Sequence, residues 1–310
     1  MRTLGEHTHC ICGHPADGAG DIGDHTTHAD VTFQPWTSGN SLPTAGNYYL
    51  TQNVVLNGMT VLTGTLCLNG YTISAKDGGC PVEVSSGVLN LTDCAAQPGS
   101  VTAAKDQAID VYSAANIFNG VIRGGSGSGI HIGPFAANGN VTIYGGKITG
   151  NTSVGEGGGV YADARSGNWR TKSVVMVQGS AQITGNKKGE ADNNLYLPRY
   201  SEGVTIRGDL DDTADIRVTT ETKPSEGSEV TIAKKSGWVS GTVTVPDGAF
   251  KVDGADGTIR IGEDGSTVKL VPHTHVWTYA LKSGTADTIT AVCSGCNASG
   301  GGGGLKGAAR

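Results

Sequence analysis

Short stretches of alternating apolar and polar residues follow one another from about residue 47 to residue 270. Val82-Glu83-Val84 and Val88-Leu89-Asn90-Leu91 are typical, and Gly or Asn separates such runs. A period of two predicts β-strands, and the glycines mark turns. Residues 100–119 contain several Ala and no Gly or Pro, so a short helix also fits there. The alternation in Ile109-Asp110-Val111-Tyr112 favours strands instead.

A longer repeat organises these strands. Ile122, Ile148 and Ile183 occupy one position in three similar segments, 26 and 35 residues apart. A second strand-like element follows each segment, so a unit consists of strand, turn, strand, turn and strand. Such a unit buries its apolar face only by stacking on a neighbour, and its strands are too short for regular hairpins. The repeat therefore predicts a β-solenoid with turns about 4.8 Å apart.

Two details of the repeat predict local structure. Thr149-Gly150-Asn151 and Thr184-Gly185-Asn186 would form the same corner in successive turns, because Gly and Asn tolerate a positive φ. The 35-residue unit is longer than the 26-residue unit. We place the extra residues at 163–172 and expect them to project as a loop.

Composition narrows the class of protein. The chain has 50 Gly among 310 residues and a net charge of −6. Each interior Gly destabilises a helix by about 1 kcal/mol relative to Ala, and the absence of a strict glycine period excludes collagen. Lys and Arg are scattered, so we expect no nucleic-acid partner. No apolar run approaches the roughly 18 residues of a membrane span, and we find neither an export signal nor an anchor. We expect the chain to belong to a longer polypeptide.

Several pieces of the chain together resemble a known family. They are His7-Thr8-His9-Cys10-Ile11-Cys12-Gly13, Leu66-Cys67-Leu68-Asn69-Gly70-Tyr71, Leu89-Asn90-Leu91-Thr92-Asp93-Cys94, Tyr144-Gly145-Gly146-Lys147-Ile148-Thr149-Gly150-Asn151 and Asn194-Leu195-Tyr196-Leu197-Pro198. They are similar to the right-handed parallel β-helix proteins found in long, repetitive surface proteins of gut-dwelling Firmicutes. The resemblance covers nearly the whole chain. It implies an all-β, right-handed parallel β-helix and an adhesin-like role at the cell surface or outside the cell.

The predicted architecture has four parts. Residues 1–46 form a Cys/His-rich segment and residues 47–203 the parallel β-helix. Residues 204–270 continue or cap it with less regular strands. Residues 271–310 contain a small zinc-ribbon-like module and a Gly-rich tail.

The two terminal segments carry the candidate metal ligands. At the C-terminal end, His273-x-His275 precedes Cys293-x-x-Cys296, and two imidazoles with two thiolates suit a structural, tetrahedral zinc ion. The other interpretation is a Cys293–Cys296 disulfide, or free thiols with exposed histidines. The N-terminal set consists of Cys10, Cys12, His25 and His28, with His7, His9 and His14 as additional donors. The sequence therefore does not decide which of these residues would bind the ion. The alternative to a metal site is a His-rich linker.

The middle of the chain offers weaker candidates for chemistry. Cys67 and Cys94 lie among apolar residues about one turn apart, which favours small core residues stacked on one another or, alternatively, a disulfide. Asp209, Asp211 and Asp212 are the candidate carboxylates of an enzyme, but the sequence favours a solvated loop after a strand for Asp211-Asp212.

The loop at 163–172 is the candidate binding element. It presents Trp169 with Arg165, Arg170 and Lys172, and an exposed Trp can stack on a sugar ring or anchor a protein contact. The alternative is a Trp169 that packs back on the strands. We therefore expect a non-catalytic surface or secreted module, binding glycans or host proteins or acting as a rigid spacer. The alternative function is a polysaccharide lyase or glycoside hydrolase on the same scaffold.

Overall fold

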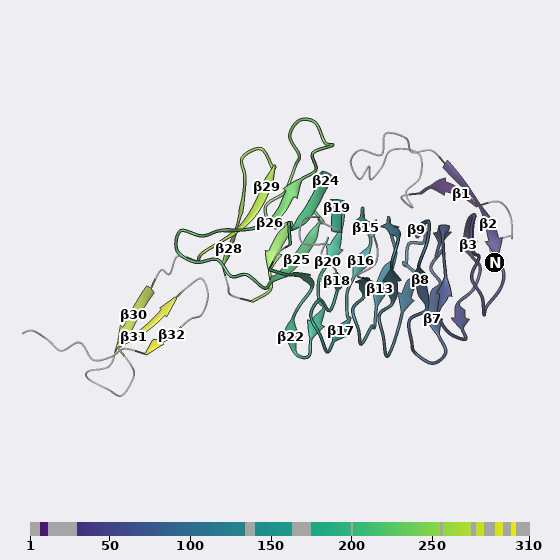
Figure 1. Ribbon diagram of the computed structural model, residues 1–310, viewed down its shortest axis with the longest axis horizontal. Coiled ribbons are helices and arrows are strands. Elements are labelled where there is room, and N and C mark those ends of the chain that lie inside the picture. Colours follow the sequence, from purple (N-terminus) through teal and green to yellow (C-terminus); the bar gives the residue numbers. More distant parts are fainter. Residues whose placement is uncertain are drawn as a thin grey trace, which may run out of the picture.

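The structure is a computed structural model in which every regular element of the described residues is a β-strand (Figure 1). It describes residues 7–11, 30–133, 140–162, 175–199, 201–254, 257–273, 277–281, 289–293 and 299–301. The described part of 100–119 forms strands, as the alternation predicts, and contains no helix. The loop predicted at 163–172 lies outside the described residues.

Two large sheets contain most of the strands. The twelve-stranded sheet has the order β1 (His7–Cys10), β2 (Asp30–Trp36), β3 (Asn47–Leu50), β6 (Gly64–Cys67), β9 (Val88–Thr92), β12 (Ala114–Ile117), β15 (Asn140–Ile143), β19 (Val175–Gly179), β24 (Val204–Leu210), β26 (Val230–Lys235), β29 (Thr267–Val271) and β28 (Thr258–Ile261). The fourteen-stranded sheet has two arms that meet at β25 (Asp215–Thr220). One arm contains β4 (Val54–Leu56), β7 (Thr72–Ala75), β10 (Ser100–Thr102), β13 (Val121–Arg123), β16 (Lys147–Ile148) and β20 (Gln182–Ile183). The other contains β5 (Thr60–Val61), β8 (Val82–Val84), β11 (Ile109–Val111), β14 (Ile130–Ile132), β18 (Val160–Ala162) and β23 (Leu195–Leu197), and β27 (Phe250–Val252) pairs with β25.

Two small sheets complete the described strands. One joins β17 (Thr152–Ser153), β21 (Lys187–Lys188) and β22 (Ala191–Asp192). The other joins β30 (Trp277–Leu281), β31 (Ile289–Cys293) and β32 (Ser299–Gly301) through antiparallel pairs.

The chain visits the large sheets in a repeating order. It passes from β9 to one arm at β10, to the other arm at β11, and back to the first sheet at β12. Strands of successive passes pair in parallel, and Ile122 pairs with Ile148, which pairs with Ile183. These are the residues that the sequence repeat aligns, so the repeat is confirmed as a strand register. An all-β fold with large, mainly parallel sheets is compatible with a β-solenoid.

Parallel pairing changes at both ends of the twelve-stranded sheet. β1 pairs antiparallel with β2 at one end, and β29 pairs antiparallel with β26 and β28 at the other. β25 is long enough to pair with β20 through Asp215 and Ile216, and with β23 through Val218 and its neighbours. This one strand thereby joins two arms that run separately along the preceding passes.

Aliphatic side chains fill the space between the sheets. In β9, Leu89 and Leu91 are fully buried, whereas Asn90 between them lies on the outer side and accepts a hydrogen bond from Asn116 of β12 (2.8 Å). The same alternation in each pass stacks Val, Leu and Ile on the residues of the next pass, about 4.8 Å away. The result is one continuous apolar core from Leu42 to Leu270.

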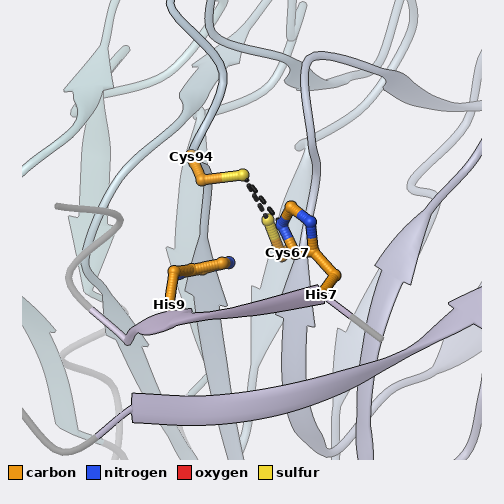
Figure 2. Close-up of side chains that lie close together, drawn as sticks. All are labelled: His7, His9, Cys67 and Cys94. Atoms are coloured by element: carbon orange, nitrogen blue, oxygen red, sulfur yellow. Dashed lines mark hydrogen bonds between the residues drawn. The ribbon is translucent and has the colours of Figure 1, made fainter. Parts of the chain in front are cut away.

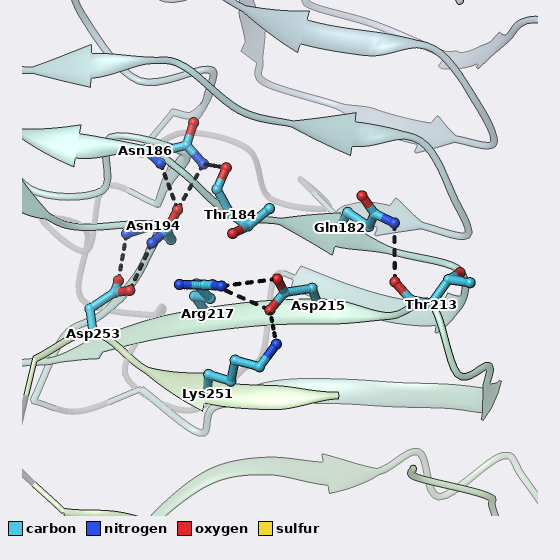
Figure 3. A network of polar contacts seen from close by, with 9 residues as sticks. All are labelled: Gln182, Thr184, Asn186, Asn194, Thr213, Asp215, Arg217, Lys251 and Asp253. Carbon is cyan, nitrogen blue, oxygen red and sulfur yellow. Dashed lines mark hydrogen bonds and ion pairs between the residues drawn. The ribbon is translucent and has the colours of Figure 1, made fainter. Parts of the chain in front are cut away.

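The corners predicted from the Thr-Gly-Asn repeats are present. Gly150 and Gly185 have φ values of 67° and 70°, a region that Gly adopts without strain. Gly150 donates its N–H to the carbonyl of Gly185 (3.1 Å), and the side chain of Asn151 donates to that of Asn186 (2.8 Å). Figure 3 shows this chain of buried amides continuing from Asn186 through Asn194.

Candidate metal centre

A second, smaller core lies apart from the main one, at the N-terminal end of the twelve-stranded sheet. It contains Phe33 of β2, Tyr49 of β3 and Cys67 of β6, all buried, with Val31 and Cys94 packed against them. Leu66, the neighbour of Cys67, belongs to the main core. Because successive strand residues point to opposite faces, Cys67 lies on the outer face of the sheet. The antiparallel pair of β1 and β2, called the hairpin below, packs against this face through contacts of His7 with Tyr49 and Cys94.

The hairpin brings two histidines to two cysteines in this outer core. His7 pairs with Phe33 and His9 with Val31, so both imidazoles share the face that carries the outer core. One ligand atom from each of His7, His9, Cys67 and Cys94 lies within 4.8 Å of the others (Figure 2). The distance from His7 Nε2 to Cys94 Sγ is 3.0 Å, and that from Cys67 Sγ to Cys94 Sγ is 3.7 Å.

The His9 imidazole is held in one orientation. Its ring stacks on Phe33 with centroids 4.5 Å apart, and its Nδ1 lies 2.5 Å from the carbonyl oxygen of Cys10. Donation from Nδ1 to that carbonyl leaves a lone pair on Nε2, the arrangement that metal-binding histidines adopt. His9 is 9% exposed, and its buried Nε2 has no hydrogen-bond partner. An unsatisfied buried polar atom costs about 1–3 kcal/mol, which a bound ion would relieve.

The two thiols titrate as a pair. The hydrogen bond from Cys67 lowers the pKa of Cys94, against the opposing effect of burial, and the two imidazoles add to the decrease. The same hydrogen bond, together with burial, raises the pKa of Cys67. Burial disfavours the charged form of His9, but the nearby sulfur of Cys94 and the Cys10 carbonyl outweigh it and raise the pKa of this imidazole. The cluster therefore favours a thiolate at Cys94, the form that binds metals.

Hydrogen bonds to the buried Asp93 hold the turn that carries Cys94 in one conformation. Asp93 is fully buried, and its carboxylate accepts hydrogen bonds from the N–H groups of Gly70 (3.2 Å), Ala95 (2.7 Å) and Gly99 (2.8 Å). Burial raises the pKa of Asp93, while these N–H groups oppose the increase. Asn69, on the adjacent turn, has a positive φ of 49° and places its Oδ1 3.7 Å from Cys94 Sγ.

These four side chains could hold a metal ion. Two sulfur and two nitrogen donors match a tetrahedral centre with metal–sulfur bonds of about 2.3 Å, in which the sulfurs stand about 3.8 Å apart. The observed 3.7 Å between Cys67 and Cys94 is close to that value. It is also far longer than the roughly 2.05 Å of a disulfide bond.

One of the four predicted N-terminal ligands, Cys10, lies within the described residues. Cys10 is fully buried, but it pairs with Asp30 and lies on the face of β1 opposite to His7 and His9. The other three predicted ligands of that set, Cys12, His25 and His28, lie outside the described residues. His7 and His9, which the sequence offered only as additional donors, are the histidines that reach the cluster.

The interpretation of Cys67 and Cys94 as small core residues stacked on one another holds for their contact, and the core that they share is the outer one. Their sulfurs do approach each other, but in the outer core and beside two imidazoles. Cys67 pairs in register with Thr92, two residues before Cys94. The sequence places the two cysteines about one turn apart, and this spacing was the only signal that could have joined them.

Other predicted site residues fall into three groups. Of the C-terminal set, His273 is half-buried and Cys293 ends β31 opposite Trp277, whereas His275 and Cys296 lie outside the described residues. The loop residues Arg165, Trp169, Arg170 and Lys172 also lie outside them. Asp209 accepts the N–H of Thr244 (2.6 Å), Asp211 accepts that of Thr213 in its own turn (2.8 Å), and Asp212 is exposed. The contacts of Asp209 and Asp211 are those of loop-stabilising residues.

Comparison with protein families, with curated proteins and with solved structures finds no match for this chain. In the part of the chain that the structure describes, no helix has the length and apolar character needed to cross a membrane.

Proposed function

We propose that this chain is a right-handed parallel β-helix that serves as a non-catalytic, adhesin-like module of a bacterial cell-surface or secreted protein. The parallel register repeated from pass to pass supports the solenoid, and crossovers between parallel strands are right-handed in about 98% of known cases. The module is part of a longer polypeptide and binds a glycan or a host surface protein. Without such a ligand it acts as a rigid spacer.

The observation that supports binding is a row of polar, planar side chains along one arm. Asp110, His131 and Tyr161 are register neighbours on β11, β14 and β18. The His131 and Tyr161 rings stack with centroids 5.8 Å apart, and Tyr161 and Tyr196 of β23 lie 6.3 Å apart. We call these four side chains the ladder.

The outer edges of the ladder suit a ligand rich in hydroxyl groups. Asp110 is 6% exposed and receives hydrogen bonds from His131 Nδ1 (2.8 Å), Gln107 (3.0 Å) and Tyr112 (3.2 Å). Because Asp110 engages Nδ1 and the imidazole side chain is 22% exposed, Nε2 of His131 is the ring nitrogen that remains for a ligand.

The charge around the ladder indicates which class of glycan it would bind. Burial, together with Glu221 and Glu156, raises the pKa of Tyr196 to about 12, so its hydroxyl stays a hydrogen-bond donor. Glu156 is ion-paired with Lys188, whereas Glu221 and Glu83, which lies beside Asp110 in register, add negative charge to the surroundings. Such a surface repels anionic polymers, so a neutral or amino-sugar glycan is the class that it favours. The strand β18 leads directly to the predicted loop at 163–172.

Screening on a glycan array, followed by titration with chitohexaose, cellohexaose and hexagalacturonate, tests the binding role. We expect a neutral or amino-sugar chain to bind, and Tyr161→Ala and Tyr196→Ala to weaken binding at least tenfold. Tyr279→Ala is the matched control, because Tyr279 is 67% exposed and lies outside the ladder. Absence of any glycan or protein ligand for the wild type would refute the binding role in favour of a spacer.

We further propose that the ion of the candidate metal centre is zinc, in a structural role. Two thiolates and two imidazoles form one of the donor sets of structural zinc sites, which are closed and four-coordinate. All four donors here come from the protein, so no position remains open for a substrate.

A further inference from the structure

We propose that a single zinc ion, bound by Nε2 of His7, Nε2 of His9 and the sulfurs of Cys67 and Cys94, fastens the β1–β2 hairpin to the outer face of the stacked strands. The hairpin then docks fully only in the metal-loaded protein. This inference rests on the zinc assignment above and adds to it a mechanical role.

The donors belong to two parts of the fold that are distant in sequence. His7 and His9 lie on β1, whereas Cys67 ends β6 and Cys94 follows β9, the next pass of the chain. In Figure 2 both histidines rise from the hairpin toward the two sulfurs. An ion at their centre would therefore cross-link the hairpin to two successive passes.

The strand pairing of β1 reaches one neighbour among the described strands. Among the described strands, β1 pairs only with β2, through four residue pairs. β2 in turn pairs with β3 through Gln34, Pro35 and Trp36. Beyond these pairs, His7 stacks on Tyr49 with centroids 4.6 Å apart. The His/Cys cluster and the rings around it thus join β1 directly to β3, β6 and the turn after β9, alongside the burial of Cys10.

The donor residues of the cluster are buried or half-buried, and their donor atoms suit a bound cation. Cys67 is fully buried, and the buried Nε2 of His9 faces the sulfurs without a hydrogen-bond partner. Zn²⁺ with two thiolates and two neutral imidazoles forms a neutral centre, which tolerates burial far better than a lone thiolate. The Cys10 carbonyl accepts the Nδ1 proton of His9 and thereby fixes its tautomer, as the hydrogen-bond partners of metal-bound histidines do.

Metal content tests the assignment. We would purify the full chain in the presence of zinc and a non-chelating phosphine reductant and measure bound zinc by plasma mass spectrometry. Cys94→Ser and His9→Gln should each lose one equivalent relative to the wild type, whatever the remaining Cys and His residues bind. Cys80→Ser and His131→Gln are matched controls, since Cys80 is a buried thiol bonded to the Val82 carbonyl (3.2 Å) and His131 belongs to the ladder. The controls should keep all their zinc.

Hydrogen exchange tests the fastening. We expect the loss of zinc, by chelation or by Cys94→Ser, to speed amide exchange at least tenfold in 7–10 and 30–36, with 204–220 unchanged as an internal reference. Unchanged zinc content in both variants, or a Cys67–Cys94 disulfide in place of the ion, would overturn the zinc assignment itself. Loss of zinc without faster exchange in the hairpin would overturn the fastening role and leave the zinc site standing.

Discussion

Replacement of the buried amide of Asn186 by a methyl group should destabilise the protein severely. Asn186 is fully buried at a corner between passes. Its Nδ2 donates to the carbonyls of Ile148 (2.8 Å) and Thr184 (3.2 Å) and to the side chain of Asn194 (2.9 Å). Its Oδ1 accepts from the backbone N–H (3.2 Å) and the side chain (2.8 Å) of Asn151. Figure 3 shows how these contacts continue through Asn194 to Asp253.

The magnitude follows from the partners that Asn186→Ala would leave behind. The backbone N–H of Asn151 loses its acceptor in the interior, which costs about 1–3 kcal/mol. The remaining bonds of Asn186 each contribute about 0.5–1 kcal/mol net, because some of their partners keep a second contact, as the Ile148 carbonyl does with the N–H of Thr184. The free energy of unfolding should therefore fall by about 3–7 kcal/mol.

Urea unfolding followed by far-ultraviolet circular dichroism measures this difference. Asn116→Ala is the control, because Asn116 makes the same kind of amide–amide bond to Asn90 (2.8 Å) at a half-buried position on the outer face. We expect it to cost about 0.5 kcal/mol, since water replaces the lost partner. Both variants should unfold with the slope of the wild type. If Asn186→Ala came within about 1 kcal/mol of the control, the buried amide chain would not stabilise the corners.

Two further predictions concern charge and backbone packing. Burial opposes ionisation of Asp215, but Arg217 and Lys251 outweigh it and lower its pKa, so the stabilisation is present above the unfolded-state pKa and lost as the pH falls through the folded value. Asp215→Asn should therefore lower stability by about 0.5–1 kcal/mol at pH 7 and not at pH 2, and an equal loss at both would contradict this account. A Cβ on Gly158 would stand 2.2 Å from the carbonyl oxygen of Lys187, whereas one on Gly237 meets nothing within 4 Å. Gly158→Ala should cost about 1–3 kcal/mol in thermal unfolding and Gly237→Ala almost nothing, and equal melting temperatures would show that the passes can separate at no cost.

The repeat could be predicted because the core itself is periodic. Ile122, Ile148 and Ile183 stack directly on one another, so the demand for an aliphatic residue recurs at each pass and remains visible in the sequence. The role of β25 in joining two arms could not be predicted. The alternation of residues in β25 determines which of them are buried. It does not determine which strands β25 pairs with, because that depends on where β20 and β23 lie.

The candidate site was only partly visible for a related reason. Motif reading groups donors that are close in sequence, such as Cys10 with Cys12, yet alternate residues of a strand share a face while adjacent ones do not. His7 and His9 satisfy that rule, and Cys10 does not. The cysteines that complete the set lie 27 residues apart, a separation that looks remote along the chain.

In stacked parallel strands, residues one pass apart are nearest neighbours, so the repeat length replaces the short motif as the unit in which sites are built. The ladder illustrates this as clearly as the metal centre does. Asp110 and His131 are 21 residues apart and share a hydrogen bond of 2.8 Å. Tyr161 and Tyr196 come from successive passes and still bring their rings within 6.3 Å. Donors, carboxylates and rings should therefore be compared at the spacing of the core repeat, because that spacing, and not proximity along the chain, determines which side chains of such a fold meet.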